Sequence, residues 1–165
     1  MLRTRASAVL VTVIAVLPAA GCYQGAGSTV NSQGPTGNGT DFEVGSDLKV
    51  QDLTLVADPD EPSTAALIMT VVNEGEADDA LISATIGAAT GATEGPIALP
   101  AGSAVRLGGP GGSPAIAFIG LAQRPGGYAP VTLMFRGAGP AQAQVAIVPA
   151  TGYYEGYGPN VDSAE

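Results

Sequence analysis

The sequence predicts an all-β domain, an antiparallel Greek-key β-sandwich of about eight strands. Apolar residues between positions 42 and 148 recur at every second residue, which is the periodicity of strands. Glycine and proline clusters interrupt these runs about every ten residues, as turns between short strands do. No long segment carries an apolar stripe at helical spacing. Because no crossover helices are expected, the strands should pair antiparallel.

The alternation assigns eight segments in order. The first, residues 49–55, has Val50 and then Leu53 on the apolar face, and this phase slip at Asp52 is typical of a β-bulge. The second, residues 65–72, is apolar on both faces and should be a central strand. The remaining expected strands cover residues 80–86, 96–99, 104–107, 114–121, 131–135 and 142–147.

Residues 1–21 are expected to be a lipoprotein signal peptide. Arg3 and Arg5 make the N-terminal region positively charged, and an apolar stretch at residues 8–17 follows. That stretch is shorter than the roughly 20 apolar residues of a membrane-spanning helix. The end, LPAAGC, resembles a bacterial lipobox, although Ala19 stands where leucine is usual. We therefore expect a diacylglyceryl group on Cys22 that holds the chain at the extracytoplasmic face of the cell membrane; an ordinary signal with a free thiol is the alternative.

The rest of the chain divides into three parts. Residues 22–41 contain the lipidated cysteine and a polar tether that is too poor in apolar residues to fold. Residues 42–148 are enough for one small core. Residues 149–165 are expected to be a flexible Gly/Tyr-rich tail, in which Tyr153, Tyr154 and Tyr157 are possible aromatic anchors for a partner.

Composition excludes several classes of function. The sequence has no histidine and one cysteine, so the common Ser-His and Cys-His catalytic schemes and a nitrogen-rich metal site are absent. Without the leader, the chain has four basic and fifteen acidic side chains. The resulting net charge of −11 repels nucleic acid. The acidic stretches 58–61 and 74–79 are interpreted as solvated turns, since neither matches a calcium loop. We expect neither an enzyme nor a cofactor.

Several segments, in order along the chain, resemble the periplasmic copper chaperones of the PCu(A)C type. Residues 72–82, with Asn73-Glu74-Gly75 and then Asp78-Asp79, are similar to that family's turn between two strands. Residues 97–107, 111–121 and 131–139 resemble its later segments. The resemblance covers essentially the whole folded region and implies a cupredoxin-like, immunoglobulin-like sandwich, in agreement with the strand pattern.

The same resemblance implies that the family's copper site is missing. Those chaperones hold Cu(I) with two His and two Met, and their His-x-Met pair falls here on Ala115 and Ala117. The other pair belongs to a loop that corresponds to residues 87–96, which contain no sulfur or imidazole. Met69 and Met134 lie in expected strands, where methionine usually fills the core.

The chain is therefore identified as a lipoprotein member of this family that lacks the copper ligands, and its Gly-, Ala- and Pro-rich composition would suit a high-GC actinobacterium. The first hypothesis is a non-enzymatic interaction or accessory protein of the cell envelope, with an unknown envelope protein as its partner. The alternative is a participant in periplasmic or cell-surface copper binding or delivery. Hydrolysis catalysed by carboxylates is a third hypothesis, but no motif in the sequence brings two acidic side chains together.

Overall fold

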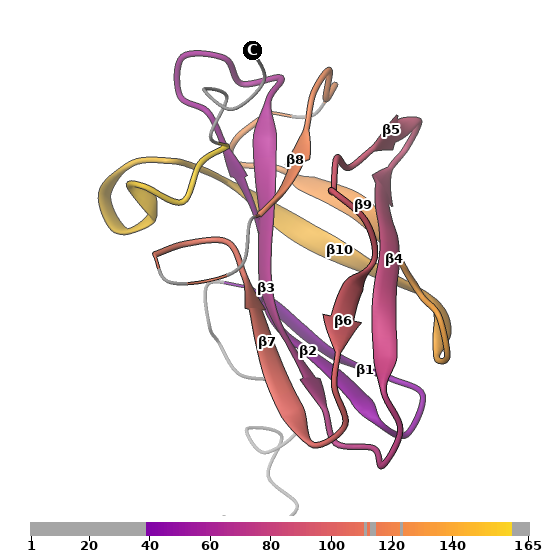
Figure 1. Cartoon of the computed structure of the whole chain (residues 1–165). Helices are drawn as coiled ribbons and strands as arrows, with labels where there is room; N and C mark the ends of the chain where they lie inside the picture. Colours follow the sequence, from indigo (N-terminus) through magenta and orange to yellow (C-terminus); the bar gives the residue numbers. More distant parts are fainter. Residues whose placement is uncertain (1–38, 111, 113–114, 123, 160–165) are drawn as a thin grey trace, which may run out of the picture. The chain divides into compact units, whose positions relative to one another are not determined.

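The computed structural model describes residues 39–159 except 111, 113–114 and 123, and this part of the chain is built from strands (Figure 1). All eight expected strands are present, and β1 and β5 are additional. The described strands are β1 (Thr40–Val44), β2 (Leu48–Ala57), β3 (Ala65–Asn73), β4 (Asp79–Ile86), β5 (Ala89–Thr90), β6 (Ile97–Leu99), β7 (Ser103–Leu107), β8 (Ile116–Phe118), β9 (Tyr128–Phe135) and β10 (Gly139–Pro149). A 3-10 turn, η3 (Gly152–Tyr154), follows them.

The strands form two layers that β10 joins. One layer contains β1, β2, β3, β7 and β8, and the other contains β4, β5, β6 and β9. Residues 139–146 of β10 pair antiparallel with β9, whereas Ile147, Val148 and Pro149 pair parallel with β2. Figure 1 shows β10 passing from one layer to the other. The expected antiparallel sandwich is thus confirmed with one correction, because the β10–β2 pair is parallel.

The bulge expected at Asp52 is present in β2. The register of β2 against β3 shifts between Gln51 and Thr54. Asp52 has φ +54°, and no other non-glycine residue in the described ranges has a positive φ. Its backbone N–H donates to the Asp41 carboxylate at 2.7 Å, which holds the bulge against β1. The bulge leaves Asp52 exposed while Leu53, the next residue, is fully buried.

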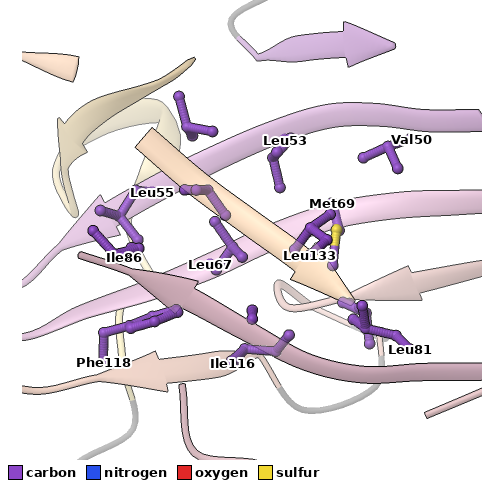
Figure 2. Packing of buried hydrophobic residues seen from close by; sticks show 14 of the residues in the cluster. Val50, Leu53, Leu55, Leu67, Met69, Leu81, Ile86, Ile116, Phe118 and Leu133 are labelled. Atoms are coloured by element: carbon purple, nitrogen blue, oxygen red, sulfur yellow. The ribbon is translucent and has the colours of Figure 1, made fainter. Parts of the chain in front are cut away.

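The core lies between the two layers and is almost entirely aliphatic. Figure 2 shows Leu53, Leu55 and Leu67 of one layer facing Leu81 and Leu133 of the other. Burial of such side chains contributes about 1.5–3 kcal/mol each, which makes this interface the main source of stability. Met69 and Met134 lie in strands as expected, but they face opposite ways: Met69 is buried in the core, and Met134 is 39% exposed on β9.

A buried asparagine organises the turn between β3 and β4. The Asn73 side-chain amide donates to the carbonyls of Ala77 and Leu99, both at 2.9 Å, and its oxygen accepts the Gly75 N–H at 3.0 Å. Asn73 is 2% exposed, so these bonds replace water that the side chain has lost. The turn that carries the family resemblance is therefore tied to the end of β6.

The folded region extends beyond its expected bounds at both ends. β1 begins at Thr40, inside the expected tether, and β10 ends at Pro149, one residue into the expected tail. Residues 150–159 continue from β10, and the Ala150 N–H donates to the Ala57 carbonyl at 2.9 Å. Cys22, the signal peptide, the tether up to residue 38 and the tail from residue 160 lie outside the described residues. Within the described ranges, no helix has the length and apolar character needed to cross a membrane.

Asp79, the first residue of β4, holds the turn between β9 and β10. Its carboxylate accepts the N–H groups of Ala80 at 2.6 Å, Gly137 at 2.7 Å and Ala138 at 3.0 Å. Partial burial alone would raise the pKa of this carboxyl, but the backbone donors, including Arg136, together outweigh burial and lower the pKa below its ordinary value of 3.8. The ionised form of Asp79 therefore stabilises the fold.

We expect Asp79→Asn to lower the free energy of unfolding by about 1–2 kcal/mol at neutral pH, because the new NH₂ group meets backbone N–H donors. Since the folded pKa is depressed, the contribution of Asp79 is complete above the unfolded pKa and is lost as pH falls through the folded pKa. Urea unfolding is measured from pH 7 down to pH 3. The difference in free energy of unfolding between wild type and variant should become smaller below about pH 4. Asp60→Asn, at an exposed aspartate, is the matched control. A difference in unfolding free energy between wild type and Asp79→Asn that stays constant with pH would contradict the stabilising role of the Asp79 carboxylate.

Candidate functional site

The first candidate site is the place where the resemblance puts the copper ligands, and it is formed by β8 and the loop 87–96. β8 pairs with β3 through Ala117 and Ala66. On its other side, Ala117 forms an isolated bridge with Ala92, whose N–H donates to the Ala117 carbonyl at 2.8 Å. The structure thus brings together the two segments on which the ligand positions fall.

The side chains at this place are small and apolar. Ala115 and Ala117 are half-buried, and Gly91 packs so closely that a Cβ there would come within 2.3 Å of Ile116. None of these residues offers nitrogen or sulfur, the donors that Cu(I) prefers, so the residues present do not fit this ion. Across the described ranges, no group of three or more His, Cys, Asp or Glu side chains could hold a metal ion.

The second candidate site begins with the tyrosines of the expected tail, which the structure gathers into one group. Tyr153 and Tyr154 meet edge to face at 5.1 Å between ring centroids, and Tyr154 and Tyr157 do so at 6.1 Å. Tyr153 and Tyr157 stack at 6.4 Å. Such arrangements contribute about 0.5–1.5 kcal/mol per pair beyond the area that they bury. Tyr153, Tyr154 and Tyr157, the tyrosine cluster, therefore pack with one another and do not form an extended end.

The tyrosine cluster is fixed to β7 and to the turn after it. Arg106 donates from Nη2 to the Tyr157 hydroxyl at 3.2 Å, and its guanidinium carbon lies 6.0 Å from the centre of the same ring. Gly109 lies directly against this ring. Its φ of +75° favours glycine, and a Cβ at this position would come within 2.4 Å of Tyr157. The glycine turn after β7 is thus what admits the aromatic ring.

Between the tyrosine cluster and the strands β2, β3 and β7 lies a pocket of about 510 Å³, the tyrosine pocket. Asp52, at the bulge, and Arg106 provide its charged groups, and Thr70 adds a hydroxyl. Ile68, which is 8% exposed, provides apolar surface, whereas Met69 and Leu107 border the pocket with side chains that belong to the buried core. Arg106 forms no ion pair with any residue that the structure describes.

Sequence reasoning had singled out the three tyrosines and the irregularity at Asp52, but it did not connect them. It gave Arg106 no role of its own, because Arg106 stands there only as one residue of the segment 97–107 that resembles the family. The signal that could have found the pocket is the bulge, since β-bulges are common next to functional sites. Residues of the acidic turns at 58–61 and 74–79 do not line the pocket: Asp58 accepts the N–H groups of Asp60 and Glu61, and Glu74 pairs with Lys49 at 2.9 Å.

No protein-family model matches the sequence, and no curated protein matches it significantly. Solved structures do match. The apo PCuAC domain from PmoF1 is 27% identical, with a TM-score of 0.58, and the match covers 67% of this chain and 99% of that domain. The copper-bound PCuAC domain from PmoF2 is 28% identical, with a TM-score of 0.54 over 67% of this chain and 98% of that domain. The apo PmoF2 PCuAC domain is 26% identical, with a TM-score of 0.57, and the match covers 68% of this chain and 98% of that domain.

These matches show that the described domain has the PCuAC-like copper-chaperone fold, and they confirm the family resemblance found in the sequence. They cover nearly the whole of each matched domain, so the likeness concerns the complete sandwich and is not limited to a few strands. The fold class predicted from the strand pattern, a cupredoxin-like or immunoglobulin-like β-sandwich, is confirmed as well.

We expect Gly109→Ala to displace the Tyr157 ring and loosen the tyrosine cluster. The chain has no tryptophan and five tyrosines, three of which form the cluster, so a change in tyrosine fluorescence between variants reports largely on the cluster. Quenching of this emission by acrylamide should increase in the variant while its circular dichroism stays that of a β-protein. Gly120→Ala is the matched control, because Gly120 has φ +77° and no atom within 4 Å of the added Cβ. Equal quenching in the two variants would show that Tyr157 does not pack on Gly109.

Proposed function

We propose that the chain is a membrane-anchored extracytoplasmic lipoprotein, and that its PCuAC-like sandwich works without the His/Met copper site as a non-enzymatic interaction or accessory protein of the cell envelope. The observation that carries the proposal is the pairing of Ala117 with Ala92. This pairing sets strand β8 against the loop 87–96, as a copper site built from both segments requires, yet both segments present methyl groups and glycine there. The fold supports the comparison with copper chaperones, whereas the side chains of β8 and the loop 87–96 argue against copper as the ligand.

The proposed anchor is a lipid on Cys22. Its support is the basic, apolar and small-residue order of the leader and the cysteine at its end. An acidic chain has no electrostatic attraction to anionic lipid headgroups, so acyl chains would have to hold it at the membrane. Its partner would be another envelope protein, since nucleic acid is disfavoured by the same charge.

A non-enzymatic role is supported by what the chain offers for chemistry. It contains no histidine, and its only thiol is the proposed lipidation site. Among the described carboxylates, that of Asp79 is occupied by backbone N–H donors, and Asp58 caps its own turn. Both carboxylates are therefore engaged in holding turns of the backbone.

Copper binding or delivery is the second candidate, and one observation favours it: a PCuAC domain described as copper-bound is 28% identical to this chain. On this chain, copper handling would need ligands outside the alanine positions, or an accessory role beside a protein that holds the metal. Cu(I) binding therefore separates the two candidates.

We expect the mature chain, residues 22–165 with Cys22→Ser to remove the thiol, to show no sub-micromolar Cu(I) binding in competition with a chromogenic chelator. Ala115→His with Ala117→Met should tighten Cu(I) binding by about tenfold or more, because imidazole and thioether groups then meet at the place built by β8 and the loop. Gln142→His with Gln144→Met puts the same pair on exposed positions of β10 and is the matched control. Tight binding by the chain without new ligands would favour the copper candidate.

We expect Cys22→Ser to move the full-length protein out of the membrane fraction of the cells that produce it, because the acyl chains then have no thiol to join. Fractionation and immunoblotting measure this, and the serine variant should also lack incorporated radiolabelled palmitate. Ser28→Ala, a change of similar size in the following tether, should leave the protein at the membrane. A serine variant that stays in the membrane fraction would contradict lipid anchoring.

A further inference from the structure

We propose that the tyrosine pocket binds a short, neutral saccharide. Its volume of about 510 Å³ lies within the range of ligand sites, roughly 300–1,000 Å³. The alanine positions at β8 offer nothing to a polar ligand, whereas this pocket combines aromatic rings, hydroxyls and two charged groups. Its lining does not include Ala115 or Ala117, although Gly108 in the lining lies next to Ala115, and it gives the domain a binding function of a different kind.

The surfaces of the pocket match the two sides of a sugar ring. Tyr153, at the rim, is 75% exposed and presents an aromatic face on which the C–H side of a pyranose can pack. Ile68, which is 8% exposed, adds a small apolar surface beside it. A ligand with one apolar face and hydroxyls around its edge fills such a pocket better than one that is polar on all sides.

The polar groups suit hydroxyls. Asp52 supplies a carboxylate that accepts hydrogen bonds, and Arg106 supplies guanidinium N–H groups that donate them. Arg106 uses Nη2 toward Tyr157 and forms no ion pair among the described residues, so further N–H groups remain for a ligand. Acceptor and donor on the same pocket can bind the hydroxyls of one sugar, each of which both donates and accepts.

The charges exclude simple ions. A ligand cation would meet Arg106, whose guanidinium already lies 6.0 Å from the Tyr157 ring. An anion would meet the Asp52 carboxylate within a chain that carries a net −11 once the leader is excluded. Asp52 and Arg106 in the lining offer an acceptor and a donor to an uncharged ligand, while the Asp41 carboxylate beside the Asp52 N–H adds a further negative charge that disfavours anions. A zwitterionic peptide is the competing ligand, and the experiment below includes one.

The backbone holds Asp52 at the pocket at an energetic cost. Its φ of +54° is unfavourable for a residue with a side chain, and the bond from its N–H to Asp41 maintains it. The Thr54 hydroxyl donates to the Asp52 carbonyl at 3.0 Å from the other side of the bulge. A glycine would relieve this conformation but would remove the carboxylate from the pocket.

The test uses the full-length chain in detergent micelles and saturation-transfer NMR with four probes: maltotriose, cellotriose, tri-N-acetylchitotriose and the dipeptide Gly-Phe. At least one trisaccharide should receive saturation from the protein. Tyr153→Ala and Arg106→Gln should each weaken that binding by about tenfold. The matched controls are Tyr128→Ala, at a tyrosine that is 69% exposed on β9, and Arg136→Gln, at an exposed arginine outside the pocket.

Circular dichroism confirms that each variant is folded before binding is compared. Loss of binding in the two pocket variants with unchanged binding in the two controls supports the proposal. Three results would overturn it: no transfer to any trisaccharide, equal effects in pocket and control variants, or binding of Gly-Phe alone.

Discussion

The two pairings of β10 are the constraint on which the rest of the structure depends. Its first eight residues complete the layer of β4 and β9, and its last three add to β2 in the other layer. This strand therefore closes the sandwich over the aliphatic core. It also decides where the chain goes next, because the Ala150 N–H bonds to Ala57 at the end of β2. The tyrosines follow from that point onto the β2, β3 and β7 side.

What holds the fold together is separate from what could bind a ligand. The core leucines, the buried amide of Asn73 and the carboxylate of Asp79 carry the stabilising contacts, and none of them lies at the alanine positions of β8. A PCuAC-like sandwich can therefore keep its architecture with any small residue at those positions. The tyrosine pocket instead combines an aspartate in a strained backbone conformation, an arginine bonded to a tyrosine hydroxyl and three aromatic rings.

The sequence indicated the fold well because strand alternation is local. The bulge at Asp52 was visible for the same reason, as a slip between Val50 and Leu53. The strand β1 was missed because its residues look polar and become a strand only by pairing with β2, and β5 is two residues long. The parallel end of β10 and the contact between Arg106 and Tyr157, 51 residues apart, depend on tertiary structure. A glycine-rich tail gives no local sign that its tyrosines will pack together.

The central claim is that the chaperone scaffold is present while the metal donors at its ligand positions are absent. A crystal structure of the mature chain grown with excess Cu(I) under reducing conditions, with diffraction recorded on both sides of the copper absorption edge, tests it most directly. The account predicts the same two-layer sandwich and no anomalous copper peak beside Ala92, Ala115 or Ala117. An ordered copper ion bound between β8 and the loop 87–96 would contradict it.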